Sequence, residues 1–152
     1  MMAPPAIYRL RVRSIRVYAR FMAGECYCAA LRKAARKVTS LYDAALEPTG
    51  INLAQFSLLR TIDRAAPVSL TELGRMTDLD RSTVGRNVRL LQRMGLVRVA
   101  PGADQREAMV VLDEPGLDVL RRGAPLWDEA QRRIEARLGS AAAQLRTLLL
   151  AF

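Results

Sequence analysis

Residues 69 to 99, which decide the fold of this chain, read SLTELGRMTDLDRSTVGRNVRLLQRMGLVRV. Ser69 is placed to cap a first short helix, and Asp80 is placed to cap a second helix eleven residues later. Gly95 ends the second helix at a position that glycine favours, and Leu96 begins a strand-like run. Two helices joined by a tight turn and followed by a strand indicate a helix-turn-helix.

The second helix of this pair has two opposite faces. The apolar face carries Val84, Val88 and Leu91. The polar face carries Ser82, Arg86, Arg89 and Arg93. A basic face of this kind suits a DNA groove, so we expect Arg86 to contact a base or a phosphate. The hydroxyls of Ser82 and Thr83 in the first turn can bond bases or phosphates, and phosphate positioning is expected of the two later arginines.

The residues after Gly95 predict a two-stranded hairpin, or wing. Its strands are expected at residues 96–100 and 108–112, and a polar tip lies between them at residues 101–107. Arg106 in the tip suits insertion into a narrow minor groove, where the negative potential is strong. Asp104 is expected to orient an arginine, because phosphate repels a bare carboxylate.

Helices are predicted on both sides of this segment. The expected ranges are 25–46, 53–65, 69–76, 80–94, 113–138 and 141–152. Ser69 and Glu72 are predicted to form a reciprocal capping box, with a buried stripe of Leu70, Leu73 and Met76. The fold class is therefore mainly α with a small β-hairpin wing.

The charge of the chain is strongly positive but uneven. The 152 residues carry a net charge of +9, and only Lys33 and Lys37 among the 24 basic residues are lysines. A basic excess favours a polyanionic partner such as nucleic acid, although a genome that prefers arginine codons would give the same composition. Residues 1–24 contain basic residues and no acid, so the argument for DNA depends on where the arginines lie.

This first segment, a basic N-terminal extension at 1–24, has several open interpretations. It resembles an organelle transit peptide in composition, and it equally suits a DNA-contacting arm, an extra dimer-packing element or a misassigned start. No stretch approaches the length of a membrane span, and no secretory signal is evident, so we expect no membrane partner. Two cysteines without a disulfide framework favour the reducing cytoplasm.

Enzymatic chemistry has little support in the sequence. The chain has no histidine, no glycine-rich phosphate loop, no catalytic triad and no cluster with metal-ligand spacing. We therefore expect no enzyme, no metal and no cofactor.

Several motifs together resemble the multiple antibiotic resistance regulator (MarR) family of winged-helix transcription factors, over about residues 25–150. The motifs are Ser69-Leu70-Thr71-Glu72-Leu73, Asp80-Arg81-Ser82-Thr83-Val84, Arg86, Gly95-Leu96-Val97, Asp104-Gln105-Arg106 and Leu112-Asp113-Glu114-Pro115-Gly116. Asp113 replaces the family's usual threonine with an equally good helix cap. Val99 stands where the family usually has an arginine.

The resemblance implies an intertwined helical homodimer. Residues 25–48 and 114–152 would form the helical dimerisation region, and residues 49–113 the winged helix-turn-helix DNA-binding domain. Two recognition helices would enter successive major grooves of double-stranded DNA at a pseudo-palindromic operator, and repression is the family's usual mode. The alternative is a dimeric winged-helix adaptor that binds protein or RNA.

The resemblance also suggests two kinds of effector. Cys28 lies fourteen residues before Tyr42, a spacing similar to the organic-hydroperoxide-sensing branch of the family, in which a cysteine bonds tyrosine hydroxyls. The position of a second such tyrosine holds Leu53, and Cys26 and Cys28 also suit simple packing. A small aromatic or phenolic acid is the other expected effector, in a cleft to which Tyr42, Phe56 and Trp127 contribute, although core packing would also explain these aromatics.

Overall fold

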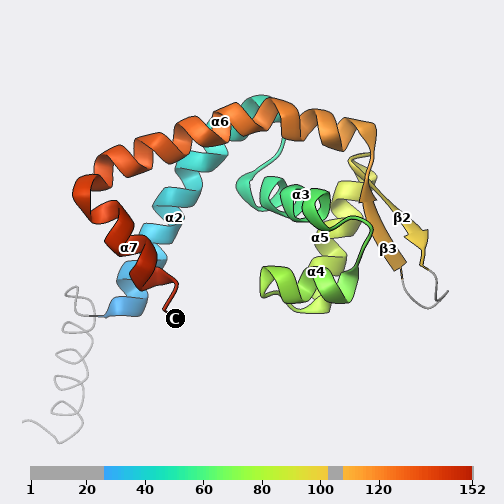
Figure 1. Ribbon diagram of the computed structural model, residues 1–152, viewed down its shortest axis with the longest axis horizontal. Coiled ribbons are helices and arrows are strands. Elements are labelled where there is room, and N and C mark those ends of the chain that lie inside the picture. The colour runs from blue at the N-terminus through green and yellow to red at the C-terminus, as the bar shows by residue number, and fades with distance from the viewer. Residues whose placement is uncertain (1–25, 103–107, 152) are drawn as a thin grey trace, which may run out of the picture. The chain divides into compact units, whose positions relative to one another are not determined.

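The computed structural model describes residues 26–102 and 108–151, and the chain divides into two compact units, Met1–Thr39 and Ser40–Phe152. In chain order the helices are α2 (Tyr27–Leu46), α3 (Leu53–Ala65), α4 (Leu70–Thr77), α5 (Arg81–Arg93), α6 (Glu114–Leu138) and α7 (Ala142–Leu149). Short 3₁₀ turns at Glu47–Thr49 and Gly139–Ala141 precede α3 and α7. The predicted mainly helical class and the predicted helices are confirmed, with ends that agree to within three residues (Figure 1).

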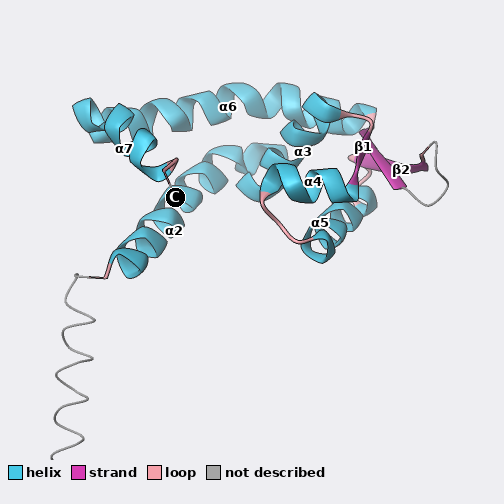
Figure 2. Cartoon of the chain, turned by 60° about the horizontal axis from the view of Figure 1, so that its bottom comes forward, coloured by secondary structure: helices cyan, strands magenta, loops and turns pink. Residues whose placement is uncertain are grey.

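The sheet has one more strand than the hairpin predicted from the sequence. The strands are β1 (Val68–Ser69), β2 (Val97–Pro101) and β3 (Ala108–Leu112), in the order β1-β3-β2, and every pair is antiparallel. Val110 in β3 pairs with Val99 of β2 on one side and with Val68 of β1 on the other. The additional strand β1 therefore lies along the edge of β3 that β2 leaves free. Figure 2 shows the sheet beside α4 and α5.

A single apolar core holds α3, α4, α5 and the sheet together. Its fully buried side chains include Phe56, Leu59, Ile62, Leu73, Val84, Val88, Leu91, Val97 and Val110. The predicted inner face of α5 is therefore confirmed. Met76 is different, because it is 44% exposed and does not belong to the buried stripe predicted for α4.

Local hydrogen bonds explain where the core helices begin. Asn52 and Gln55 form a reciprocal capping box at the start of α3, with bonds of 3.0 and 2.9 Å. The Ser69 hydroxyl accepts the Glu72 amide at the start of α4, as predicted. The Glu72 carboxylate accepts the Arg75 guanidinium instead of returning to the backbone, so only half of the predicted box is recorded.

One glycine fixes the approach of α6 to the wing. A Cβ on Gly116 would lie 2.1 Å from the carbonyl oxygen of Leu96, which accepts the Asp113 amide at 3.1 Å. Asp113 occupies the cap position of α6 as predicted, although its carboxylate makes no capping bond and pairs with Arg98 at 3.3 Å. None of the described helices is long and apolar enough to cross a membrane.

Candidate nucleic-acid interface

The outer face of α5 is basic and open to solvent. Arg86, Arg89 and Arg93 are exposed, as is Ser82 in the first turn, while Thr83 is partly buried. Val84 and Val88, on the opposite side, are buried in the core. The helix is thus held by its apolar face and presents guanidinium groups outward, as the sequence predicted.

Asp80 organises the first turn of α5. Its Oδ1 accepts the Thr83 amide at 2.9 Å and the Ser82 hydroxyl at 2.5 Å, and its Oδ2 accepts the Thr83 hydroxyl at 2.7 Å. These bonds, that from the Ser82 hydroxyl first, hold the pKa of Asp80 well below its ordinary value. The carboxylate is therefore ionised at neutral pH and acts only as an acceptor.

The hydrogen bonds continue from Asp80 to an arginine. Thr83 Oγ1 accepts an N–H of the Arg86 guanidinium at 3.2 Å. This bond uses one of the five N–H groups of Arg86, so the exposed guanidinium keeps donors for another partner. The sequence placed Ser82, Thr83 and Arg86 on this surface, but it did not reveal that Asp80 links them.

The wing carries the other predicted DNA contacts at its tip. Asp104 and Arg106 lie outside the described residues, so their roles stay predictions. At the base of the wing, Arg98 is exposed and pairs with Asp113, a contact that the sequence analysis missed. The sequence signals that could have predicted this ion pair are the arginine at position 98, near the start of the first wing strand, and the acid at position 113, at the cap of the following helix.

Tyr42 is buried by aromatic and polar neighbours. Its ring stacks on Trp127 with centroids 5.8 Å apart, and its hydroxyl donates to Gln131 Oε1. Burial, and then the charge of Glu135, raise the pKa of Tyr42. Cys28 is a free, exposed thiol. The hydroxyl that was predicted to face a cysteine is therefore engaged by an amide of α6.

Two of the three aromatic residues expected at an effector cleft line a cavity, and Tyr42 is not part of its lining. Phe56 and Trp127 line a space of about 360 Å³ between α3 and α6, together with Arg60, Asp63, Leu120, Ala124 and Asp128. The Arg60 guanidinium lies 4.5 Å from the centre of the Trp127 ring and 5.9 Å from that of Phe56. The Arg60 guanidinium can pair with the carboxylate of an aromatic acid against the apolar wall, while Asp63 and Asp128 bring two negative charges to the same lining.

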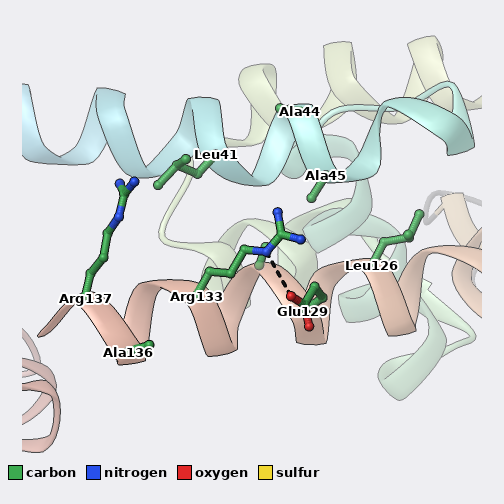
Figure 3. Close-up of a pocket in the computed structure, with 9 residues that line it drawn as sticks. Leu41, Ala44, Ala45, Leu126, Glu129, Arg133, Ala136 and Arg137 are labelled. Carbon is green, nitrogen blue, oxygen red and sulfur yellow. Dashed lines mark hydrogen bonds and ion pairs between the residues drawn. The ribbon is translucent and has the colours of Figure 1, made fainter. Parts of the chain in front are cut away.

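A second groove of about 520 Å³ lies between the C-terminal end of α2 and α6 (Figure 3). Leu41, Ala45 and Leu126 contribute to its apolar wall, and Arg133 at its rim is held by Glu129 at 2.8 Å. No group of three or more potential metal ligands occurs among the described residues.

Comparisons with known proteins agree on one family. Residues 49–107 match the MarR family. The chain is 29% identical over 82 residues to YwoH of Bacillus subtilis (strain 168), described as an uncharacterized HTH-type transcriptional regulator. This match covers 54% of the chain and spans 60% of the length of YwoH.

Solved structures match over a larger part of the chain. The transcriptional regulator MosR of M. tuberculosis, crystallised in complex with DNA, is 35% identical, with a TM-score of 0.74 over 84% of this chain and 93% of MosR. A probable transcriptional regulator from Pseudomonas aeruginosa is 25% identical, with a TM-score of 0.74 over 84% of this chain and 96% of that protein.

Proposed function

Because this chain belongs to the MarR family of winged helix proteins, we propose that it is a sequence-specific DNA-binding transcriptional regulator. The observation that carries the proposal is the outer face of α5, where Arg86, Arg89 and Arg93 are exposed behind a buried apolar stripe. The DNA complex of MosR supports it, since MosR is similar over most of both chains. The wing lies beside α5 and carries Arg98 at its base and Arg106 at its tip.

Each contact has a role set by its chemistry. Arg86 contacts a base edge or a phosphate from the middle of α5, and Ser82 and Thr83 act from its first turn. Arg89 and Arg93, farther along the same face, position the helix on phosphates. At the wing tip, Arg106 enters the minor groove and Asp104 orients an arginine.

The test begins with a selection of bound duplexes from the source genome, followed by fluorescence anisotropy on an enriched site. We expect tight binding that random DNA competes poorly. Arg86→Ala should weaken DNA binding roughly 10- to 100-fold. If Arg86 contacts a phosphate, the slope of the logarithm of the binding constant against the logarithm of salt concentration should also become shallower by about one. Arg106→Ala should also weaken binding.

Arg64→Ala is the matched control, because it removes the same charge from an exposed position on α3. The affinity of Arg64→Ala for DNA should stay within about twofold of that of the wild type. If no sequence is enriched, or if Arg86→Ala and Arg106→Ala both bind as tightly as the control with the fold intact by circular dichroism, the proposal is wrong. Binding only to RNA or to a protein would favour the adaptor alternative.

The regulator acts as a homodimer and represses transcription from a pseudo-palindromic operator, with half-sites roughly 10 base pairs apart. An effector releases it by favouring a different separation of the two recognition helices. The free energy that favours this different separation would come from a small aromatic acid bound beside Arg60 and Trp127, or from oxidation of the exposed Cys28.

One pair of titrations separates the two effectors. Trp127 is the only tryptophan of the chain, so its fluorescence reports on the cavity directly. Benzoate and phenolic acids should change this fluorescence and lower DNA affinity, and Arg60→Leu should abolish both effects. Cumene hydroperoxide should instead lower DNA affinity in a way that Cys28→Ser prevents. If neither treatment changes DNA affinity, release by these effectors is excluded.

A further inference from the structure

The first turn of α5 contains a hydrogen-bond arrangement that limits what its hydroxyls can recognise. The carboxylate of Asp80 has no proton to give, so Ser82 Oγ, at 2.5 Å, and Thr83 Oγ1, at 2.7 Å, must each donate to it. A hydroxyl has a single proton. Both hydroxyls have therefore spent their only donor inside the protein, and the lone pairs that remain can only accept.

The count of free lone pairs differs between the two residues. Ser82 is exposed and accepts no hydrogen bond from the residues that the structure describes, so its oxygen retains its accepting capacity. Thr83 Oγ1 already accepts from Arg86 at 3.2 Å, which leaves it one lone pair. Ser82 is thus the freer acceptor on the outer face.

DNA offers very different partners to an acceptor and to a donor. Phosphate oxygens accept only, as do guanine O6 and N7 and thymine O4, so a hydroxyl that cannot donate makes no hydrogen bond to them. In the major groove the available donors are the exocyclic amino groups of adenine (N6) and cytosine (N4).

We propose that Asp80 is a specificity-determining positioning residue, which makes Ser82 and Thr83 acceptors that select the amino group of adenine or cytosine and exclude phosphate contacts. This inference rests on the proposed function, because it concerns how α5 reads DNA. It narrows the two roles, base or phosphate, that the sequence left open for these hydroxyls. The same carboxylate holds Thr83 where Thr83 steadies Arg86.

Asp80→Asn provides the sharpest variant. Asparagine is as good a helix cap as aspartate, so its side-chain oxygen can still accept the Thr83 amide. Its amide group donates to one of the two hydroxyls, which regains a proton to donate elsewhere. The fold is therefore kept while the polarity of one hydroxyl is reversed, and Asp80→Ser is a second neutral cap if Asp80→Asn folds poorly.

The experiment uses a duplex selected by the full-length wild type. At each half-site position, adenine is replaced by purine and cytosine by 2-pyrimidinone, both of which lack the amino group. We expect one or two positions where the replacement weakens wild-type binding roughly three- to tenfold. At those positions Ser82→Ala or Thr83→Val should make the protein insensitive to the replacement, and Asp80→Asn should shift the preferred base toward guanine or thymine.

Other results would overturn the inference. If a methylphosphonate linkage and Ser82→Ala are non-additive, the hydroxyl donates to a phosphate, and the assignment is wrong. It is also wrong if Asp80→Asn lowers affinity equally for all four bases, because a purely structural cap would do that. If the wild type enriches no DNA sequence, the proposed function fails and the inference fails with it. If the wild type does enrich a DNA sequence and Asp80→Asn prefers the same bases as the wild type, the inference is wrong while the proposed function stands.

Discussion

At the scale of single residues, two buried glycines in helices differ in the space around them for an added side chain. Gly116 lies where α6 touches the turn before the wing, and a Cβ there would meet the Leu96 carbonyl oxygen at 2.1 Å. Gly85 lies within α5, and a Cβ there would meet only the flexible end of Arg89, at 3.9 Å. Backbone cannot yield as a side-chain end can, so the two positions should respond differently to one added methyl group.

We predict that Gly116→Ala lowers the free energy of unfolding by about 1–3 kcal/mol, because the added methyl group forces the backbone apart. Gly85→Ala is the matched substitution, and it should raise the free energy of unfolding by about 0.5–1 kcal/mol through its higher helix propensity. Urea denaturation followed by circular dichroism measures both. Equal effects of the two substitutions would contradict the contact seen at Gly116.

At the scale of elements, the sequence was informative wherever a repeating pattern or a capping residue decided the structure. The apolar face of α5 and the caps at Ser69 and Asp80 were predictable, because helical spacing and short polar side chains have local causes. So was the outward face of α5, from which the candidate site is built.

The features that the sequence did not reveal depend on tertiary contacts. β1 has only Val68 and Ser69, too few for an alternating pattern, and it exists because β3 pairs with it. The exposure of Met76 depends on how α4 packs, which helical spacing alone does not determine. In the candidate site, the sequence places Asp80, Ser82 and Thr83 in one helical turn, but only their geometry shows which atoms donate hydrogen bonds and which accept them.

The start of α5 should also make stability depend on pH. The pKa of Asp80 is lower in the folded chain than in the unfolded chain, so below neutrality the unfolded state binds more protons. The stabilisation from Asp80 is therefore fully present above about pH 4, the ordinary pKa of aspartate, and is lost as pH falls toward the folded value.

We predict that the free energy of unfolding of the wild type falls more steeply between about pH 5 and pH 2 than that of Asp80→Asn, whose cap does not titrate. Urea denaturation at several pH values measures the difference between the two proteins. The other carboxylates are common to both, so their titration largely cancels in this difference. Parallel curves would show that the bonds to Asp80 do not stabilise the folded state.

At the scale of the whole molecule, apolar side chains lie exposed at both ends of the described chain. On α2 they include Tyr27 and Leu31, with exposed fractions of 87% and 43%. At the C-terminal end they include Leu148 and Leu149, at 55% and 49%. The core is complete without these residues, since none of them belongs to the buried cluster. Exposed apolar surface of this kind favours association with another chain, as a homodimer requires.

We predict that the wild type sediments with twice the 16.9 kDa mass of one chain and that Leu148→Glu combined with Leu149→Glu shifts it toward one chain. Each chain then buries two carboxylates without partners in an apolar interface, so association should weaken by about 100-fold or more. Analytical ultracentrifugation measures the mass, and circular dichroism should show that the winged-helix core remains folded. DNA affinity should fall with the dimer, because each lone subunit binds only one half-site.

The matched control adds the same two charges at polar, exposed positions in the same region, as Ser140→Glu combined with Gln144→Glu. This variant should remain dimeric, which separates the loss of apolar contact from a general effect of negative charge near DNA. A wild type that sediments as one chain at micromolar concentration, or a leucine variant that stays as dimeric as the control, would contradict the prediction. Tight operator binding by a single subunit would further show that the exposed leucines serve a purpose other than pairing two recognition helices on one duplex.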